Sequence, residues 1–416
     1  MTSPALPHYI DGERVRADAS NASLNPSNTD EVVALFPEGG EAEVDAAVQA
    51  ARRAFPAWSE ASPELRSDCL DRVGDAILNR REELGHLLSR EEGKTLAEGI
   101  GETARAGRIF KYFAGEALRR HGQNLDSVRP GVEIQTYRQA VGVFGLITPW
   151  NFPIAIPAWK AAPALAFGNT VVLKPAGPTP AIAAALADII FDAAVPKGVF
   201  NLVFGGGRVG EAIVRHPGID GISFTGSQRV GQSVAAGAVA RQARVQLEMG
   251  GKNPLVVLDD ADLDRAVGIA LDGGYFATGQ RCTASSKLIV TAGIHDRFVA
   301  ALAQRLEALR IGDALDPQTQ MGPAVSAEQL EQNLRYVEIA RQEGGRVLGG
   351  GQPLQLATPG YYMSPALVTE TGPEMRINRE EVFGPVASVL RVKNYEEALE
   401  QANGGEFGLS AGIVTG

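Results

Sequence analysis

Apolar residues recur with a helical period along the chain after residue 40. Between Glu41 and Trp58 they fall at positions 44, 47, 48, 51 and 55, which is the stripe of an amphipathic helix. Similar spacing predicts a second helical segment over 63–89 and a third over about 97–120. Residues 40–120 are therefore expected to be mostly helical.

From residue 139 the pattern changes to short apolar runs that alternate with helical segments. The runs predict strands over 141–147, 170–174, 200–204, 221–225 and 245–248, and helices over 156–167 and 180–194. A second series of this kind begins with a strand over 254–258 and continues with helices at about 262–278 and 296–309. This alternation predicts the α/β class, with mostly parallel, doubly wound sheets that bind ligands at the carboxyl ends of their strands.

Composition narrows the class of protein without identifying a chemistry. A chain of 416 residues favours two or three domains, and its net charge of -10 argues against nucleic acid or an anionic membrane surface as a partner. With only two cysteines, Cys69 and Cys282, no disulfide framework is expected. The first residues do not resemble a signal peptide, and the apolar runs are too short to cross a bilayer, so a cytoplasmic location is expected.

Three short segments carry a thiol, a carboxylate and a carboxamide that could act together in one reaction. They are Gly279-Gln280-Arg281-Cys282-Thr283, Leu247-Glu248-Met249-Gly250-Gly251 and Thr148-Pro149-Trp150-Asn151-Phe152-Pro153. A thiolate can add to an aldehyde carbonyl, a carboxamide can stabilise the resulting oxyanion, and a carboxylate can activate the water that later hydrolyses the thioester. A cysteine in a protein of this size is more often a small buried hydrophobe, which describes Cys69 well. The polar, Gly-bounded setting distinguishes Cys282, and the glycines beside Glu248 predict that this carboxylate is partly buried.

All three segments resemble the aldehyde dehydrogenase superfamily, and the similarity runs from about Tyr9 to the last residue. The resemblance implies that Cys282 is the nucleophile, that Asn151 donates to the oxyanion beside the backbone N–H of Cys282, and that Glu248 activates water. Family members that pass the acyl group to coenzyme A tend to lack this Glu, so hydrolysis to the free acid is expected. No metal site is expected.

The same resemblance implies a fold and a division of the chain. The fold would be that of the aldehyde dehydrogenases, with two doubly wound α/β domains, one for the cofactor and one catalytic, and a small bridging hairpin. Residues 1–118 and 140–250 would form the NAD(P)-binding domain. Residues 119–139 would form the hairpin that mediates oligomerisation, and residues 251–416 the catalytic domain.

The cofactor site is expected at two Gly-rich turns. Gly205–Gly210 matches G-x-G-x-x-G, a weak signal without the acidic residue about twenty positions on. The resemblance points instead to Phe224-Thr225-Gly226-Ser227, with Ser227 as a helix N-cap and a donor to phosphate. Many NAD-specific relatives carry a Glu where this chain has Gly177, so Lys174 could pair with a 2′-phosphate and NADP is favoured over NAD. The cofactor-binding residues expected are Thr148, Pro149, Trp150, Lys174, Gly177, Gly207, Phe224, Gly226, Ser227, Glu381 and Phe383, the last two at the nicotinamide ribose and ring.

Four further segments look most like the bacterial 2,5-dioxopentanoate (α-ketoglutaric semialdehyde) dehydrogenases. They are residues 101–105, 112–116, 153–160 and 360–362. Succinate-semialdehyde dehydrogenases carry a carboxylate-binding Arg where this chain has Trp159, which weakens an assignment to that group of enzymes. Arg105, Arg119 and Arg281 are unranked candidates for holding a substrate carboxylate.

The last residue is Gly416, whereas members of the family continue for several tens of residues. The absent part would carry a loop at the substrate tunnel and a last strand that pairs in the family homodimer or homotetramer. A catalytically impaired, nucleotide-binding relative of these enzymes therefore stays open as a second hypothesis. The sequence is also compatible with a succinate-semialdehyde or general aldehyde dehydrogenase, and with a thiol esterase that uses Cys282 and Glu248 without a nucleotide.

Overall fold

The computed structural model describes residues 5–119 and 122–416, which form two compact units. Unit 1 holds the described residues of Met1–Ser23, Val32–Leu88 and Gly99–Glu248. Unit 2 holds Leu24–Glu31, Ser89–Glu98 and Met249–Gly416. The chain thus enters unit 2 twice, briefly, before it stays there from Met249 onward.

The sequence analysis placed residues 24–31 and 89–98 in the first domain, whereas in the structure both segments belong to unit 2. Backbone hydrogen bonds tie both segments to distant residues: Thr29 N–H donates to Pro359 O at 2.6 Å, and Leu96 N–H to Ala314 O at 2.9 Å. The partners lie more than two hundred positions away, so no local pattern in the sequence could reveal these contacts.

Four helices follow residue 40, where the sequence predicted three helical segments. They are α1 (Glu41–Glu60), α2 (Pro63–Asn79), α3 (Arg81–Glu92) and α4 (Leu96–Ala117). Ser62 caps α2 by accepting a hydrogen bond from Leu65 N–H at 3.1 Å. The single helical segment expected over 63–89 was wrong, because the chain leaves helical geometry at Arg80 (φ -105°, ψ 15°).

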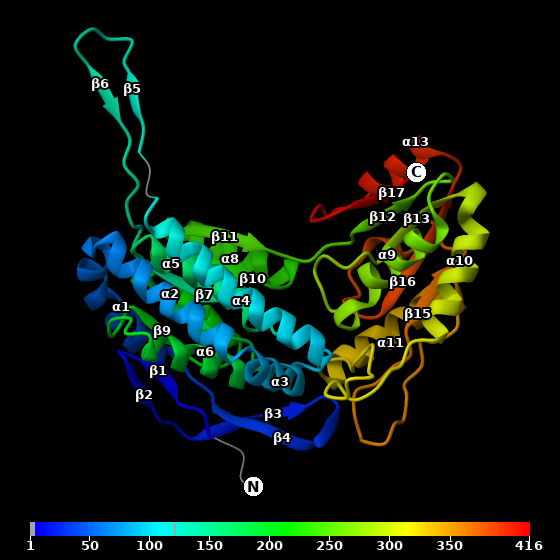
Figure 1. Cartoon of the computed structure of the whole chain (residues 1–416), viewed down its shortest axis with the longest axis horizontal. Coiled ribbons are helices and arrows are strands. Elements are labelled where there is room, and N and C mark those ends of the chain that lie inside the picture. Colours follow the sequence, from blue (N-terminus) through cyan, green and yellow to red (C-terminus); the bar gives the residue numbers. More distant parts are fainter. Residues whose placement is uncertain (1–4, 120–121) are drawn as a thin grey trace. The chain divides into compact units, whose positions relative to one another are not determined.

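Unit 1 contains the predicted doubly wound, mostly parallel sheet, with strand order β11-β10-β7-β8-β9-β1-β2 (Figure 1). Five strands are parallel: β7 (Val143–Ile147), β8 (Thr170–Lys174), β9 (Phe200–Leu202), β10 (Gly221–Thr225) and β11 (Arg244–Glu248). The connecting helices are α5 (Ala155–Ala166), α6 (Pro180–Asp192), α7 (Gly207–Arg215) and α8 (Gln228–Ala240). The antiparallel strands β1 (His8–Ile10) and β2 (Glu13–Val15) were not predicted, because three residues are too few to show a period.

Unit 2 is a second α/β sheet with strand order β14-β15-β16-β13-β12-β17. Its strands are β12 (Pro254–Val257), β13 (Lys287–Thr291), β14 (Arg346–Leu348), β15 (Ala366–Thr369), β16 (Val386–Val392) and β17 (Gly412–Val414). All neighbours are parallel except β14 and β15. The helices are α9 (Leu263–Tyr275), the 3₁₀ turn η1 (Phe276–Gly279), α10 (Ala292–Glu307), α11 (Ala327–Gln342), α12 (Arg376–Arg379) and α13 (Tyr395–Asn403).

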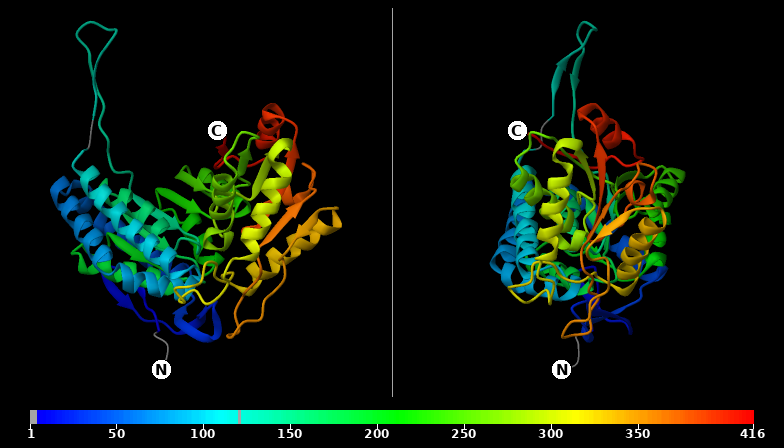
Figure 2. Two further views of the ribbon diagram at one scale, coloured as in Figure 1. Left: turned by 45° about the vertical axis from the view of Figure 1, so that its right-hand side comes forward. Right: turned by 90° about the vertical axis from the view of Figure 1, so that its right-hand side faces the viewer.

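Two strand pairs lie outside the large sheets. Strands β3 (Ala19–Asn25) and β4 (Asn28–Pro37) form one pair. Strands β5 (Asn124–Asp126) and β6 (Glu133–Gln135) form an antiparallel hairpin within the predicted span 119–139, and it projects from unit 1 (Figure 1, Figure 2). Residues 120 and 121 of that span lie outside the described residues.

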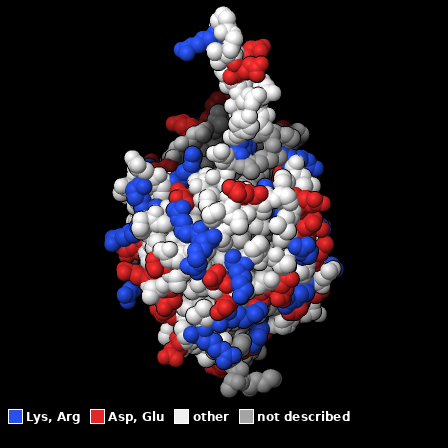
Figure 3. Space-filling view, turned by 90° about the vertical axis from the view of Figure 1, so that its left-hand side faces the viewer, with Lys and Arg blue, Asp and Glu red and all other residues white. Residues whose placement is uncertain are grey.

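Surface charge agrees with the composition. On the face shown in Figure 3, basic and acidic side chains are interspersed and form no broad basic surface. Within residues 5–119 and 122–416, no helix combines the length and apolar character needed to cross a bilayer. The same residues contain no cluster of His, Cys, Asp and Glu that could hold a metal ion.

Candidate active site

The strand register of unit 1 brings several predicted site residues to one edge of its sheet. Ile147 pairs with Lys174 across β7 and β8, Ile147 also pairs with Phe224, and Thr225 pairs with Glu248. All four strands run in parallel, so their carboxyl ends coincide, as the doubly wound pattern predicts. Segments that follow Ile147, Lys174, Thr225 and Glu248 therefore share one edge.

Asn151 lies in the loop between β7 and α5, which is fixed at both ends. Thr148 N–H donates to Lys174 O at 3.2 Å at the start of the loop. At its end, the backbone N–H groups of Ile154 and Ala155 both donate to Glu102 Oε1, each at 3.1 Å. Asn151 is buried, and so is Glu102 on α4. The loop therefore presents Asn151 from a rigid frame, which an oxyanion donor requires.

Glu248 ends β11 and belongs to a chain of polar side chains that sequence reasoning missed. Lys160 Nζ on α5 lies 2.7 Å from Ser223 Oγ and 3.3 Å from Gln246 Oε1. Ser223 Oγ is 2.5 Å from the same oxygen, and Gln246 Nε2 donates to Glu248 Oε1 at 2.8 Å. Burial lowers the pKa of Lys160 to about 8, against the attraction of Glu248. The spacing of Gln246 and Glu248, two apart on a strand, could have revealed part of this chain.

The sequence-based expectation that Glu248 is partly buried was wrong. Residues Arg244, Gln246 and Glu248 are all exposed, whereas Val245 and Leu247 between them are half-buried. This is the alternation of an edge strand, and β11 is the last strand of its sheet. The glycines that follow Glu248 indicated that other atoms approach the backbone closely there. They did not indicate on which face of β11 the Glu248 carboxylate lies.

Cys282 follows a strained stretch of backbone in unit 2. Ala277 (φ 51°), Thr278 (φ 56°) and Gly279 (φ 66°) are three successive residues in left-handed conformation. Only glycine adopts this conformation without cost, and a β-branched Thr there is an outlier. This turn ends α9 at Tyr275, earlier than the predicted helix over 262–278. Such strain persists where the surroundings fix it, and it gathers at functional sites.

Hydrogen bonds to neighbours fix that stretch. Ala277 N–H donates to Glu98 Oε1 at 2.7 Å, and Thr278 Oγ1 to Gly322 O at 3.1 Å. After the turn, Asn253 Nδ2 donates to Cys282 O at 2.7 Å. The Cys282 backbone is thereby anchored on both sides, while its side chain remains partly exposed. Cys69, by contrast, is fully buried, which confirms the prediction that it is a small buried hydrophobe.

Glu381, which is expected to contact the nicotinamide ribose, belongs to unit 2. Its Oε1 accepts a hydrogen bond from Gly251 N–H at 3.1 Å, and a Cβ on Gly250 would lie 1.9 Å from Oε2. The approach of this carboxylate thus explains Gly250, whereas a Cβ on Gly251 would lie 2.6 Å from Asn253 Oδ1. Burial raises the pKa of Glu381, and burial lowers the pKa of the neighbouring Lys252 to about 7. Phe383, two residues on, has a left-handed backbone (φ 62°).

The predicted phosphate-binding turn lies between β10 and α8. Gly226 N–H donates to Glu248 O at 3.1 Å, and a Cβ on Gly226 would come within 2.6 Å of the Phe224 ring, so a larger residue would have to displace that ring. Ser227 occupies the N-cap position of the 13-residue helix α8, but its hydroxyl makes no capping bond. The hydroxyl and the first N–H groups of α8 suit a phosphate.

The second Gly-rich turn lies beside Lys174. Helix α7 begins at Gly207, and a Cβ on Gly210 would lie 3.7 Å from Lys174 Cδ. Glu38 Oε1 accepts a hydrogen bond from Gly206 N–H at 2.8 Å. Lys174 Nζ donates to Pro175 O at 2.9 Å, and burial lowers its pKa to about 8, against the attraction of Glu38. Glu38 is a carboxylate that the sequence analysis did not connect with this site.

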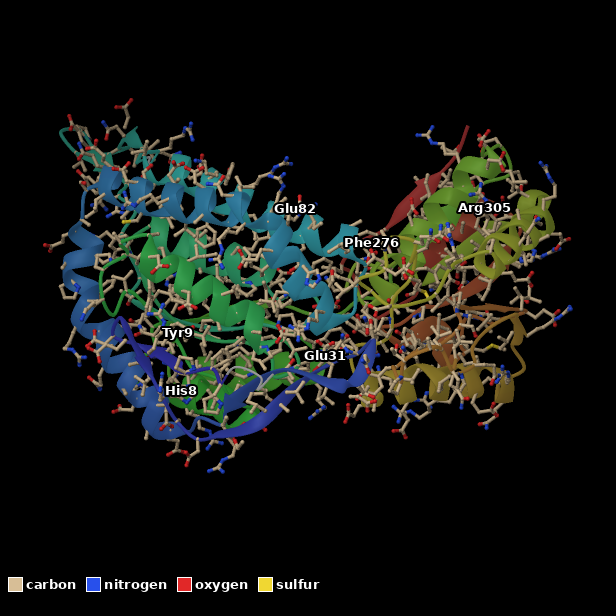
Figure 4. All side chains as sticks on the ribbon, turned by 60° about the horizontal axis from the view of Figure 1, so that its bottom comes forward. His8, Tyr9, Glu31, Glu82, Phe276 and Arg305 are labelled. Atoms are coloured by element: carbon tan, nitrogen blue, oxygen red, sulfur yellow. The ribbon has the colours of Figure 1, made fainter. Side chains whose placement is uncertain are left out.

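The three arginines left unranked by the sequence have different surroundings. Arg119 pairs with Glu116 at 3.0 Å. Arg281 donates to Asp272 O and Gly273 O at 3.1 and 2.7 Å and stacks on Phe276, which is labelled in Figure 4. Arg105 instead lines a pocket in unit 1, with its guanidinium 5.6 Å from the centre of the Trp159 ring.

The chain is similar to known proteins over nearly all of its length. A model of the aldehyde dehydrogenase family matches residues 15–416. The alpha-ketoglutaric semialdehyde dehydrogenase of Bacillus subtilis is 42% identical over 98% of this chain and 85% of its own length. A crystal structure of betaine aldehyde dehydrogenase from Staphylococcus aureus in complex with NAD⁺ has a TM-score of 0.96 at 36% identity, covering 98% of this chain and 82% of that one. A crystal structure of an E. coli NADP dependent enzyme also has a TM-score of 0.96, at 35% identity, covering 99% of this chain and 86% of that one.

Proposed function

Because the chain belongs to the aldehyde dehydrogenase family, we propose that it oxidises a semialdehyde such as 2,5-dioxopentanoate to the carboxylic acid, with Cys282 as nucleophile and Glu248 as base. The observation that carries this proposal is the set of three groups, each on a fixed backbone: Cys282 after a strained turn, Asn151 in a clamped loop, and Glu248 at a strand end. The semialdehyde relative from B. subtilis supports the choice of substrate, while betaine aldehyde dehydrogenase is also a near neighbour.

The residues would act in two stages. In the first, the Cys282 thiolate forms an S–C bond to the aldehyde carbon, and the oxyanion accepts hydrogen bonds from the Asn151 amide and the Cys282 N–H. Collapse of this thiohemiacetal oxyanion to a thioester expels a hydride, and a bound nicotinamide cofactor would supply the acceptor for it. In the second stage, Glu248 takes a proton from water as the oxygen attacks the thioester carbon. The S–C bond then breaks, which releases the acid and returns the thiolate.

We infer that the cofactor is NADP or NAD, with NADP favoured. The N-cap hydroxyl of Ser227, which makes no capping hydrogen bond, and the small residue at Gly226 fit a pyrophosphate. Glu381 and Phe383 would contact the nicotinamide ribose and ring. Gly177 offers no carboxylate to repel a 2′-phosphate, and Lys174 offers a cation to receive it. Thr148, Pro149, Trp150, Gly207 and Phe224 would complete the site.

The expected homodimer or homotetramer is likewise a proposal. Five apolar side chains on and beside the β5–β6 hairpin are exposed: Leu125, Val128, Val132, Ile134 and Tyr137. A projecting two-stranded ribbon is marginally stable alone, and exposed apolar residues on it favour association with another copy.

The direct test is to mix the protein with 2,5-dioxopentanoate and NADP or NAD and to follow the absorbance of the reduced cofactor. Wild type should turn over, and Cys282→Ala should not, while both bind the cofactor, as shown by a raised Tm. If Cys282→Ala retained dehydrogenase turnover, the assigned nucleophile would be wrong. Cofactor binding without turnover in wild type would favour a nucleotide-binding protein that is catalytically impaired. Nucleotide-independent hydrolysis of an ester, and no oxidation, would favour the thiol esterase.

A further inference from the structure

We propose that Arg105 and Arg108 form the subsite that binds the carboxylate end of an anionic aldehyde, an inference that rests on the proposed function. Both side chains line a pocket of about 600 Å³ in unit 1. The pocket is bounded by Gly101, Ala104, Arg105, Arg108, Ile109, Tyr112, Phe113 and Trp159. This size is within the usual range of small-molecule sites.

Helical spacing explains why one helix supplies most of this pocket. Gly101, Arg105, Arg108 and Tyr112 on α4 follow one another at intervals of four, three and four residues, so they share one face. Trp159 faces them from α5, and the Arg105 guanidinium lies 5.6 Å from the centre of its ring. The result is an aromatic wall beside two cations, with Gly101 leaving space at one end.

Within residues 5–119 and 122–416, no carboxylate forms an ion pair with either guanidinium group, and none of the eight lining residues is acidic. Arg119 and Arg281, by contrast, already have partners in Glu116 and in backbone carbonyls. Two arginines that line one pocket from the same face of a helix, neither paired with a described carboxylate, favour a bidentate anion such as a carboxylate.

The pocket is structurally connected to the loop that carries Asn151. Glu102 precedes Arg105 by three residues on α4, and its carboxylate accepts the backbone N–H groups of Ile154 and Ala155. Trp159 lies one turn further along the helix that begins at Ala155. The oxyanion donor and the arginine pair are therefore fixed to the same two helices. A short substrate could bind the arginines at one end while its aldehyde extends toward Asn151.

The test compares two aldehydes of five carbons that differ in charge, 2,5-dioxopentanoate and pentanal. In Arg105→Gln/Arg108→Gln, kcat/KM for 2,5-dioxopentanoate should fall roughly 10–100-fold, mainly through KM, because charge-assisted hydrogen bonds are lost. The value for pentanal should change by less than about twofold. Arg105→Lys, which keeps the charge, should restore part of the loss. The matched control is Arg119→Gln, just beyond the end of the same helix, which should alter neither substrate.

Equal losses for both aldehydes would contradict the proposal, since they would indicate that the arginines act through packing. No loss for either aldehyde would contradict it as well. If wild type oxidises neither aldehyde, the proposed function fails, and calorimetric titration with 2-oxoglutarate decides this inference separately. Binding that is roughly tenfold weaker in the double variant supports the subsite. Equal binding in both proteins, or none in wild type, overturns it.

Discussion

Gln246 Nε2 donates a hydrogen bond of 2.8 Å to Oε1 of Glu248, two residues along the same strand. The opposite end of the carboxamide, Oε1, accepts from two buried donors, Ser223 Oγ and Lys160 Nζ. Because that oxygen is occupied, the NH₂ group is left facing the carboxylate. The side chain of the proposed base is thus held by an amide whose own orientation is set from the interior of unit 1.

A first prediction follows for Gln246→Leu, which keeps the size of the side chain but removes its hydrogen bonds. The hydrolytic stage should slow by about 3–10-fold, since the lost bond is to a charged but exposed group. The first turnover, which forms the thioester, should be little affected. Stopped-flow absorbance of the reduced cofactor separates the two stages. Arg244→Gln, on the same exposed face of β11, is the control. A slower first turnover with an unchanged steady state would refute the positioning role.

Cofactor preference should respond to two carboxylates near Lys174. Gly177→Glu places a new one there, and space exists because the nearest atom to a Cβ at this position is Phe36 Cζ at 3.7 Å. We expect the NADP-to-NAD ratio of kcat/KM to fall by roughly one to two decades. Glu38→Gln, which retains an acceptor for Gly206 N–H, should move the ratio the other way. Unchanged ratios in both variants would exclude this account of preference.

Lys160 should make stability depend on pH. Its pKa is lowered to about 8 from 10.5 by burial, so the folded protein releases this proton at lower pH than the unfolded chain does. Between these pH values the unfolded chain binds more protons, and Lys160 therefore makes the free energy of unfolding rise with pH. Lys160→Met removes this contribution. The variant should have a higher Tm than wild type, and the difference should be greatest near pH 7 and shrink toward pH 9.5. Near pH 7 it should correspond to about 1–3 kcal/mol in the free energy of unfolding.

The control for that measurement is Lys197→Met, because Lys197 is well exposed and pairs only at 3.9 Å with Glu13. Its difference from wild type should not vary with pH over the same range. If the Tm curves of Lys160→Met and wild type ran parallel from pH 7 to 9.5, the charge of Lys160 would not be linked to folding.

Much of the fold was predictable because the spacing of buried apolar residues along the chain determines where helices and strands form. The strands Thr170–Lys174 and Gly221–Thr225 have the predicted bounds, since each is a continuous apolar or β-branched run that ends at a turn. The sequence did not predict the short strands β1 and β2, nor that residues 24–31 and 89–98 belong to unit 2. These features depend on hydrogen bonds to residues far along the chain. The segments that carry Asn151 and Glu248 lie at the same edge of the sheet because their strands run in parallel, which the sequence predicted. The exposure of Glu248 was not predictable, because it depends on β11 being the last strand of the sheet.

Side-chain partners were the least predictable part of the candidate site. Glu38 lies more than 130 positions from Gly206, and Lys160 more than 60 from Ser223, so only the folded structure brings these groups together. The left-handed turn at Ala277 and Thr278 was likewise not predictable from the sequence, since neither residue favours that conformation. It is maintained by bonds to Glu98 and Gly322.

The central claim, that Cys282 forms a thioester which Glu248 hydrolyses, is tested most directly by stopped-flow kinetics of Glu248→Gln. On mixing with aldehyde and cofactor, the variant should release close to one reduced cofactor per active site in a rapid burst. Turnover after the burst should be at least about 100-fold slower than in wild type, because the thioester forms but lacks its base. Steady turnover at the wild-type rate would contradict the claim.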